Sequence, residues 1–110
     1  MVARMPAELS AYFGGCASEF EVVLEANSSI SQNGDDAIEL FNGETLIEVF
    51  GDSDMDGTGM PWEYSGSWAY KTEGIWTYGG IDCSVGSTTT QDSNCIYPIC
   101  KEALELKGVL

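Results

Sequence analysis

The sequence predicts a small all-β domain, a β-sandwich with short helical turns at its ends. Three observations support this fold class: a strong hairpin signal near the middle of the chain, two aromatic-rich strand patterns after it, and a length of only 110 residues. A chain of this length buries roughly 60–70% of the surface that its unfolded form exposes. We therefore expect one modest core and a single domain.

The hairpin signal lies at residues 37–50. Two runs rich in β-branched and aromatic residues flank Asn42-Gly43, a dipeptide that tolerates the positive φ angles of a tight hairpin turn. Apolar residues on both faces of the second strand predict a position inside a sandwich rather than at an open edge. These are Ile47 and Val49 on one face, and Leu46 and Phe50 on the other, beside Glu48.

Further strands are expected at residues 67–71 and 74–78, where aromatic residues dominate. Residues 19–25 alternate only partly, which leaves a strand or a short helix open. Residues 51–61 are dense in Asp and Gly, and residues 79–94 are rich in Gly, Ser and Thr, so both predict loops.

The two ends of the chain favour helical turns. We interpret residues 1–16 as an N-terminal segment with a short helix over 6–13, because Pro6 suits a helix start and Gly14-Gly15 a helix end. The tail, residues 101–110, also begins with a short helical pattern, over 101–107.

The chain is strongly acidic. Eighteen Asp and Glu face four Lys and Arg, which gives a net charge of −14, and no basic residue lies between residues 5 and 70. Nucleic acids and anionic lipids are bound largely through Lys and Arg, so the sequence argues against both as ligands. Cationic partners fit better: a divalent metal ion or a basic protein surface. The alternative is that the carboxylates only confer solubility.

Four cysteines in so short a chain favour disulfides and an oxidising compartment, extracellular or at a cell surface. A zinc site is the alternative, but the sequence has no histidine and no Cys-x-x-Cys pair. No stretch is apolar enough for a membrane span, and the first residues lack the apolar run of a signal peptide. We therefore expect that an export signal has been removed or that the chain is part of a longer protein. The candidates, with all three pairings open, are Cys16, Cys83, Cys95 and Cys100.

Residues 52–63 match the calcium-loop pattern in which alternate carboxylates converge on a hard cation and a glycine permits the bend. The context is not that of a helix pair, because a strand pattern precedes the loop and Pro61 interrupts its end. We expect Ca²⁺ binding outside a helix pair, with a solvated Asp/Gly turn as the alternative. The candidate ligands are Asp52, Asp54, Asp56 and Glu63.

Six aromatic residues alternate through the segment that holds the last two predicted strands. An exposed strip of aromatic rings can stack on sugar rings, which predicts carbohydrate binding. The alternative is that the rings fill the core, because the chain has few other large side chains. The strip consists of Trp62, Tyr64, Trp68, Tyr70, Trp76 and Tyr78.

The sequence predicts no catalytic activity. The absence of histidine excludes Ser-His-Asp and Cys-His mechanisms. Pairs of carboxylates are easily found in a chain with eighteen of them and do not by themselves indicate acid–base catalysis. No glycine-rich phosphate loop follows a strand in the required way.

Five segments carry a family resemblance: NGDDAIELF at 33–41, LIEVFG at 46–51, DGTG at 56–59, WEY at 62–64 and SWAYK at 67–71. Together they resemble the bacterial-type lamin-tail domain over residues 17–100. The resemblance implies an immunoglobulin-like β-sandwich with an accessory, adhesive or scaffolding role. It is to the C-terminal portion of the domain, because the first strands are missing from residues 1–32.

We therefore expect a non-catalytic interaction or scaffolding module that binds a protein partner or forms an oligomer. Two alternatives stay open. The chain is a structural subunit whose sheet a partner completes by strand addition, or it is a carbohydrate-binding module that uses the aromatic strip.

Overall fold

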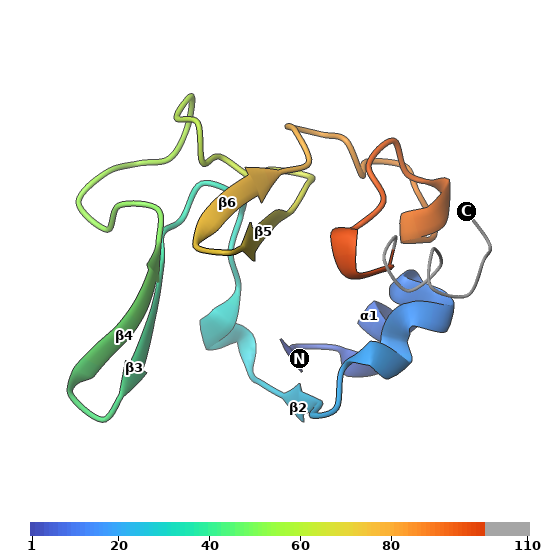
Figure 1. The fold of residues 1–110 in the computed structure, drawn as a ribbon, viewed down its shortest axis with the longest axis horizontal. Helices are drawn as coiled ribbons and strands as arrows, with labels where there is room; N and C mark the ends of the chain where they lie inside the picture. Colours follow the sequence, from blue (N-terminus) through green and yellow to red (C-terminus); the bar gives the residue numbers. More distant parts are fainter. Residues whose placement is uncertain (101–110) are drawn as a thin grey trace. The chain divides into compact units, whose positions relative to one another are not determined.

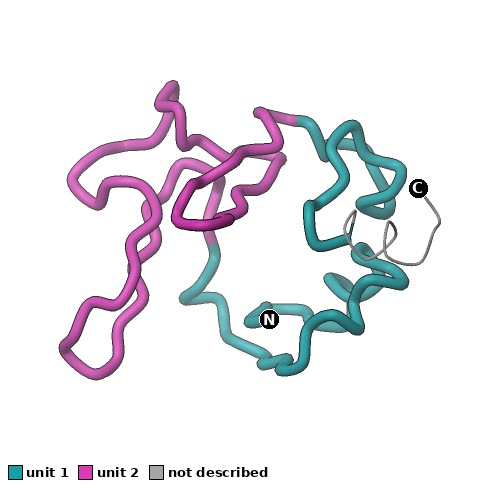
Figure 2. Tube along the Cα trace, viewed as in Figure 1, with its two compact units in different colours: residues 1–31, 83–110 teal, residues 32–82 magenta. Residues whose placement is uncertain are grey.

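The structure is a computed structural model, and it describes residues 1–100. The chain forms two compact units (Figures 1 and 2). Unit 1 combines Met1–Ser31 with the segment that begins at Cys83, and unit 2 is Gln32–Asp82. The helical turns expected at 101–107 lie outside the described residues, and the predicted segment boundaries at residues 16 and 100 stay predictions.

The described strands pair into three sheets of two strands each. In unit 1, β1 (Val2–Ala3) pairs in parallel with β2 (Leu24–Glu25). Unit 2 holds two antiparallel hairpins: β3 (Ile38–Asn42) with β4 (Thr45–Phe50), and β5 (Ala69–Thr72) with β6 (Ile75–Tyr78). The predicted hairpins are confirmed, in the form of small separate sheets, and the fold is not clearly an all-β sandwich.

Helical turns are confirmed near the N-terminus. Helix α1 (Pro6–Phe13) starts at the proline, and Gly14 adopts a φ of 64°, which favours glycine. The expected end of helical structure at Gly14-Gly15 is not observed, because the 3₁₀ helix η1 (Gly14–Glu19) follows α1 directly. Two further 3₁₀ turns are η2 (Ser28–Ile30) and η3 (Thr90–Asp92). Within residues 1–100, no helix is long and apolar enough to cross a membrane.

The β3–β4 hairpin departs from strict alternation. Its register shifts between Leu40 and Phe41, so that Phe41 pairs with Leu46 and one extra residue, Ile47, is accommodated in β4. Directly paired residues share a face of an antiparallel sheet. Leu46 therefore lies on the same face as Val49, whose partner is Glu39, and the expectation that Leu46 shares the face of Phe50 is wrong.

The core of unit 1 is built on a disulfide between Cys16 and Cys100, both of which are buried. Four partly buried side chains pack against it: Phe13, Ile96, Tyr97 and Ile99. A second disulfide joins Cys83 to Cys95. The predicted disulfides are confirmed, and one of the three open pairings is realised. Unit 2 contains no cysteine.

Candidate functional site

Aromatic rings form the core of unit 2. Phe50, at the end of β4, is only 6% exposed and contacts four other rings, with centroid distances of 4.8 Å to Trp76 and 5.4 Å to Tyr64. Trp62 and Tyr78 complete the group at 6.0 and 6.4 Å. Four of the six residues of the predicted aromatic strip thus surround one phenylalanine. Trp68 and Tyr70, the other two, are half-buried.

Edge-to-face geometry holds this cluster together. The planes of Trp62, Tyr64 and Trp76 lie 70–85° from that of Phe50, an arrangement that puts the positive edge of one ring against the negative face of another. Such pairs add about 0.5–1.5 kcal/mol each beyond the area that they bury. For these residues the arrangement favours the core role over an open stacking platform.

Two glycines let Trp62 approach the backbone closely. A β-carbon at Gly57 would lie 2.6 Å from the indole ring and 2.7 Å from the carbonyl oxygen of Asp35. A β-carbon at Gly51 would lie 2.7 Å from the same ring, and its φ of 76° also favours glycine. The Gly57 amide donates a hydrogen bond of 2.9 Å to the Asp35 carbonyl, which fixes the Asp-rich loop to the segment before β3.

A mostly apolar groove of about 250 Å³ opens beside this cluster. Glu48 is its one charged lining residue, and its carboxylate accepts a hydrogen bond of 2.7 Å from the Lys71 ammonium. Lys71 also lies 5.6 Å from the centre of the Trp76 ring, a cation–π contact. The lining residues are Ile38, Leu40, Glu48, Phe50, Tyr64, Ala69 and Trp76.

Tyr64 lines the groove, and its hydroxyl bonds to the segment before β3. Its hydroxyl donates to the Asp36 carbonyl oxygen at 3.0 Å and lies 3.2 Å from the side-chain oxygen of Gln32. Burial raises the pKa of this phenol above 10.0, and the negative charges of Asp36 and Asp35 raise it further. Tyr64 therefore stays neutral at physiological pH and acts there as a hydrogen-bond donor.

The hairpin next to the groove exposes many apolar side chains. Single exposed hydrophobic residues are normal on soluble proteins, whereas neighbouring ones on one face indicate an interaction surface. Ile38 and Leu40 are neighbours on the groove face, and Phe41 and Leu46 lie on the opposite face. The prediction that β4 lies inside a sandwich is wrong for the described residues, because both faces of the hairpin are open along most of its length. The exposed side chains are Ile38 (39%), Leu40 (57%), Phe41 (50%), Leu46 (47%) and Ile47 (56%).

Three of the four predicted calcium ligands accept hydrogen bonds from backbone amides of their own loop. Asp52 accepts from the Asp54 amide, Asp56 from the Thr58 amide, and Glu63 from the Gly59 amide, each at 2.8–2.9 Å. Within residues 1–100 no three Asp, Glu, Cys or His side chains converge in a way that could hold a metal ion. The four carboxylates are thus not brought together, and Ca²⁺ binding stays a prediction.

Asp56 instead joins the segment before β3. It shares a hollow of about 520 Å³ with Asp35 and Asp36, and Asp35 accepts a 2.9 Å hydrogen bond from the Thr58 hydroxyl. The Thr58 backbone amide, followed by its hydroxyl, lowers the pKa of Asp56 below 3.8. Asp35 was not among the predicted ligands. The Asp35-Asp36 pair is visible in the sequence, but its association with Asp56 could not be predicted because the two lie far apart along the chain.

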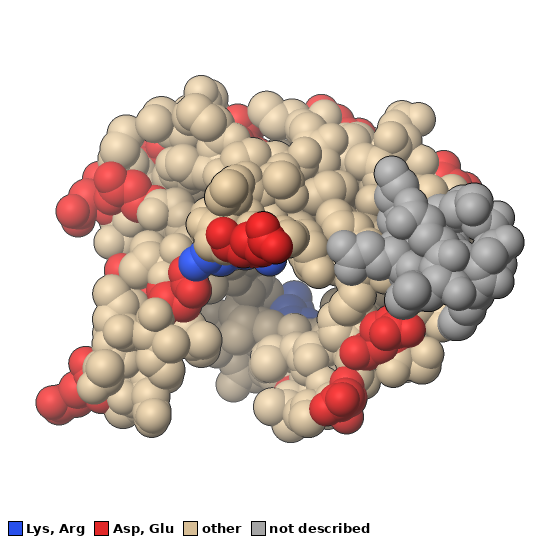
Figure 3. Space-filling model, in the orientation of Figure 1, with Lys and Arg blue, Asp and Glu red and all other residues tan. Residues whose placement is uncertain are grey.

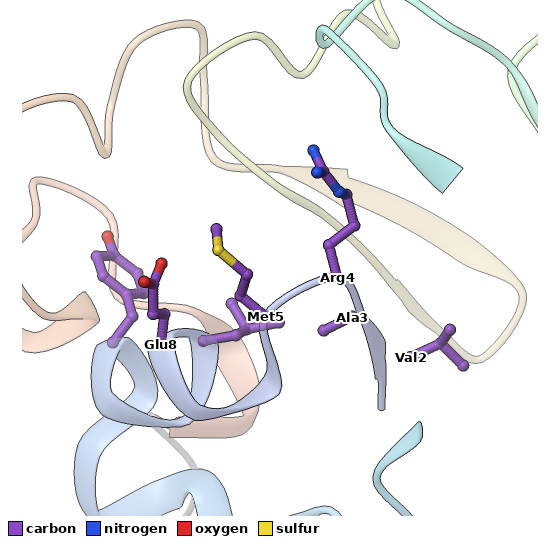
Figure 4. A pocket seen from close by; sticks show the side chains of 7 residues that line it. Val2, Ala3, Arg4, Met5 and Glu8 are labelled. Carbon is purple, nitrogen blue, oxygen red and sulfur yellow. The ribbon is translucent and has the colours of Figure 1, made fainter. Parts of the chain in front are cut away.

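Unit 1 has an open depression of about 380 Å³ between β1 and α1 (Figure 4). Figure 4 shows Arg4 and Met5 rising from the connecting segment, with Glu8 on the helix. Arg4 donates a 3.2 Å hydrogen bond to the Ser31 hydroxyl, and both Arg4 and Glu8 are exposed. The depression therefore offers two solvated charges and no buried polar group aimed at a ligand.

Comparison with known protein families, curated proteins and solved structures finds no match to this chain. The functional interpretation of the unit 2 groove is therefore based on the geometry of the groove alone. Trp76 and Tyr64 of its lining were candidates from the sequence, whereas Ile38 and Leu40 were not. Their alternation along the first strand of the hairpin was the available signal.

Proposed function

We propose that the chain is a non-catalytic binding module whose binding surface is the apolar groove of unit 2 together with the exposed strand β3 that lines it. One observation carries this proposal: large apolar side chains of β3 remain exposed beside an apolar cavity of about 250 Å³. Binding sites for apolar groups combine such a cavity with a few polar groups that fix orientation. Among the lining residues, Tyr64 and Glu48 carry polar side-chain groups.

The two disulfides support a proposal for the compartment. Two disulfides in a chain of 110 residues suggest an oxidising environment. We propose an extracellular or cell-surface location on this basis. A scaffolding role in a larger secreted or surface protein is consistent with it.

The lamin-tail resemblance belongs to the same proposal. The two hairpins of unit 2 lie at the segments that carry the resemblance, which supports a relation to the C-terminal portion of such a domain. An immunoglobulin-like sandwich would need further strands beside these two-stranded sheets. A partner that supplies them would make the chain a structural subunit, the second function that we consider.

Two other functions have less support. Carbohydrate binding needs open ring faces, whereas Trp62 is buried and Tyr64 and Trp76 are half-buried around Phe50, and of these four rings Tyr78 is the exposed one. Calcium stabilisation needs converging carboxylates, whereas three of the four predicted ligands accept hydrogen bonds from amides of their own loop. Both stay testable by adding glycans or Ca²⁺ during thermal unfolding.

The proposed function is tested by titrating the protein with small neutral apolar probes, such as indole or an N-acetylated leucine amide, while recording backbone and methyl NMR spectra. We expect shifts at Ile38, Leu40 and Ala69, and weaker binding in a Leu40→Ser variant. The matched control is Leu46→Ser, an exposed leucine on the opposite face of the hairpin. Shifts that are absent, or equal in both variants, would refute the groove as a binding surface.

A further inference from the structure

We infer that the natural occupant of this surface is an extended, cationic polypeptide segment that adds as a strand beside β3 and alternates apolar with Lys or Arg residues. This inference rests on the proposed function and names the chemistry of the partner. It follows from three features of unit 2: its charge, the open edge of β3 and the alternation of the side chains along that strand.

Charge selects the sign of the partner. Residues 32–82 contain eleven of the eighteen acidic residues and a single basic one, Lys71, which is paired with Glu48. Acidic atoms also far outnumber basic ones on the molecular face in Figure 3. A surface of one sign attracts partners of the opposite sign and repels like charge. The expected partner is therefore basic.

The same charge argues against a second copy of this chain. Each copy carries a net charge of −14, so two copies meeting through their acidic units would repel each other. Nucleic acids and anionic membranes are disfavoured for the same reason. Among macromolecules, a basic protein segment fits best.

The open wall of the groove is β3. On the β4 side Phe50 is buried among the rings and Glu48 is bonded to Lys71, whereas Ile38 and Leu40 of β3 remain exposed. In the described part of the chain, β3 pairs only with β4, so its other backbone edge has no strand beside it. An unpaired edge next to exposed apolar side chains is the arrangement that peptide ligands use in strand addition.

The side chains of β3 set the pattern of the added strand. Neighbouring residues on adjacent strands share a face, with β-carbons about 4.5–5.5 Å apart. The partner residues beside Ile38 and Leu40 would extend the apolar face over the groove. The residue beside the exposed Glu39, on the other face, would gain from a positive charge. Apolar and cationic residues therefore alternate.

The test uses a short fluorescent peptide of alternating valine and lysine, with dissociation constants measured by anisotropy on the intact, oxidised protein. Leu40→Ser should weaken binding about tenfold, while Leu46→Ser should leave it unchanged. Glu39→Gln should weaken binding, in contrast to Glu73→Gln, which removes an equal charge from the β5–β6 turn. Binding should fall as salt rises from about 0.1 M to about 1 M, because the Debye length shrinks from about 10 to about 3 Å.

Two control peptides sharpen the outcome. A valine–glutamate peptide should not bind, and a valine–lysine peptide with N-methyl groups along one edge should bind far more weakly, because it cannot pair with β3. Equal binding of the N-methylated peptide would overturn strand addition. Equal binding of the acidic peptide would overturn the charge argument.

A peptide-free dimer that buries β3 in sedimentation and NMR experiments would replace the cationic partner by a second copy. If apolar probes bind while the cationic strand does not, this inference fails and the proposed function stands.

Discussion

The small cores of the two compact units are stabilised by different interactions. Unit 1 packs Phe13, Ile96, Tyr97 and Ile99 around the Cys16–Cys100 disulfide and carries the second disulfide as well. Unit 2 has no cysteine and relies on aromatic rings gathered around Phe50. Covalent closure thus stabilises one unit, and edge-to-face packing the other.

The difference has a functional consequence. A unit held by cross-links does not need extensive sheet structure, and unit 1 has only a two-residue parallel pairing. In unit 2 the large aromatic side chains pack in one cluster around Phe50. The turn-proximal part of the β3–β4 hairpin is exposed to solvent in the described structure. The unit with the non-covalent core is therefore also the one that carries the proposed binding surface.

Removing the Cys16–Cys100 disulfide should have the largest effect on this comparison. The two cysteines are 84 residues apart, and closing a loop of that length is worth about 4–5 kcal/mol in the chain-entropy account. In a Cys16→Ser/Cys100→Ser variant we expect the helical circular-dichroism signal of unit 1 to unfold at much lower denaturant. All three tryptophans lie in unit 2, so the fluorescence transition should move little.

The matched control is Cys83→Ser/Cys95→Ser. That disulfide closes a separation of 12 residues, so its loss should cost about 3 kcal/mol, less than the loss of the long-range one. If removal of either disulfide moved the tryptophan transition as far as the helical one, the two units would not be stabilised separately.

Phe50→Ala should be the corresponding change in unit 2. Truncating a buried phenylalanine typically costs about 3–5 kcal/mol, and here four ring contacts are lost together. The tryptophan fluorescence transition should fall to lower denaturant, while the helical signal stays near its wild-type midpoint. Phe41→Ala serves as the control, because Phe41 is 50% exposed and should cost far less. Equal losses in the two variants would refute Phe50 as the centre of the core.

Gly57→Ala should have an intermediate effect. The new methyl group meets both the Trp62 ring and the Asp35 carbonyl, and overpacking of this kind costs about 1–3 kcal/mol. Gly15→Ala in unit 1 is the control, since nothing lies within 4 Å of that position, and it should be neutral or stabilising by up to about 1 kcal/mol. Thermal unfolding of both variants measures the two changes in melting temperature. Changes of the same sign and size would contradict the predicted difference between Gly57 and Gly15.

The smallest effect should come from acid. Hydrogen bonds from Thr58 in unit 2 and from Thr88 in unit 1 lower the pKa values of Asp56 and Asp92 below 3.8. Their stabilisation is therefore complete above the unfolded-state pKa and is lost as the pH falls through the lower folded-state values. Carboxyl ¹³C titration should show both pKa values below 3.8. An Asp92→Asn variant should lose acid sensitivity only in unit 1, and a normal pKa at either site would contradict the assignment.

Local chemistry made much of the fold predictable. The Asn42-Gly43 turn, with Gly43 at a φ of 61°, and the β-branched runs beside it determined the first hairpin. Pro6 and Gly14 marked the limits of α1. Such signals act within a few residues, which is why they can be recognised without tertiary information.

Features that depend on distant residues were not predictable. The cysteine spacing does not choose among three pairings, and the partner of Cys16 lies 84 residues away. The bulge at Ile47 changes which residues share a face of the hairpin, and no local sequence pattern predicts it. The carboxylates of the Asp-rich loop match a calcium pattern by spacing, but their use depends on nearby amides such as those of Asp54 and Thr58.

The most direct test of the central claim is amide hydrogen exchange of the oxidised protein with and without the valine–lysine peptide. We expect the peptide to slow amide exchange along β3, residues 38–42, and to leave exchange in residues 1–31 unchanged. Unaltered exchange in β3 at saturating peptide, or protection confined to residues 1–31, would contradict the claim that unit 2 presents an open strand edge for a partner.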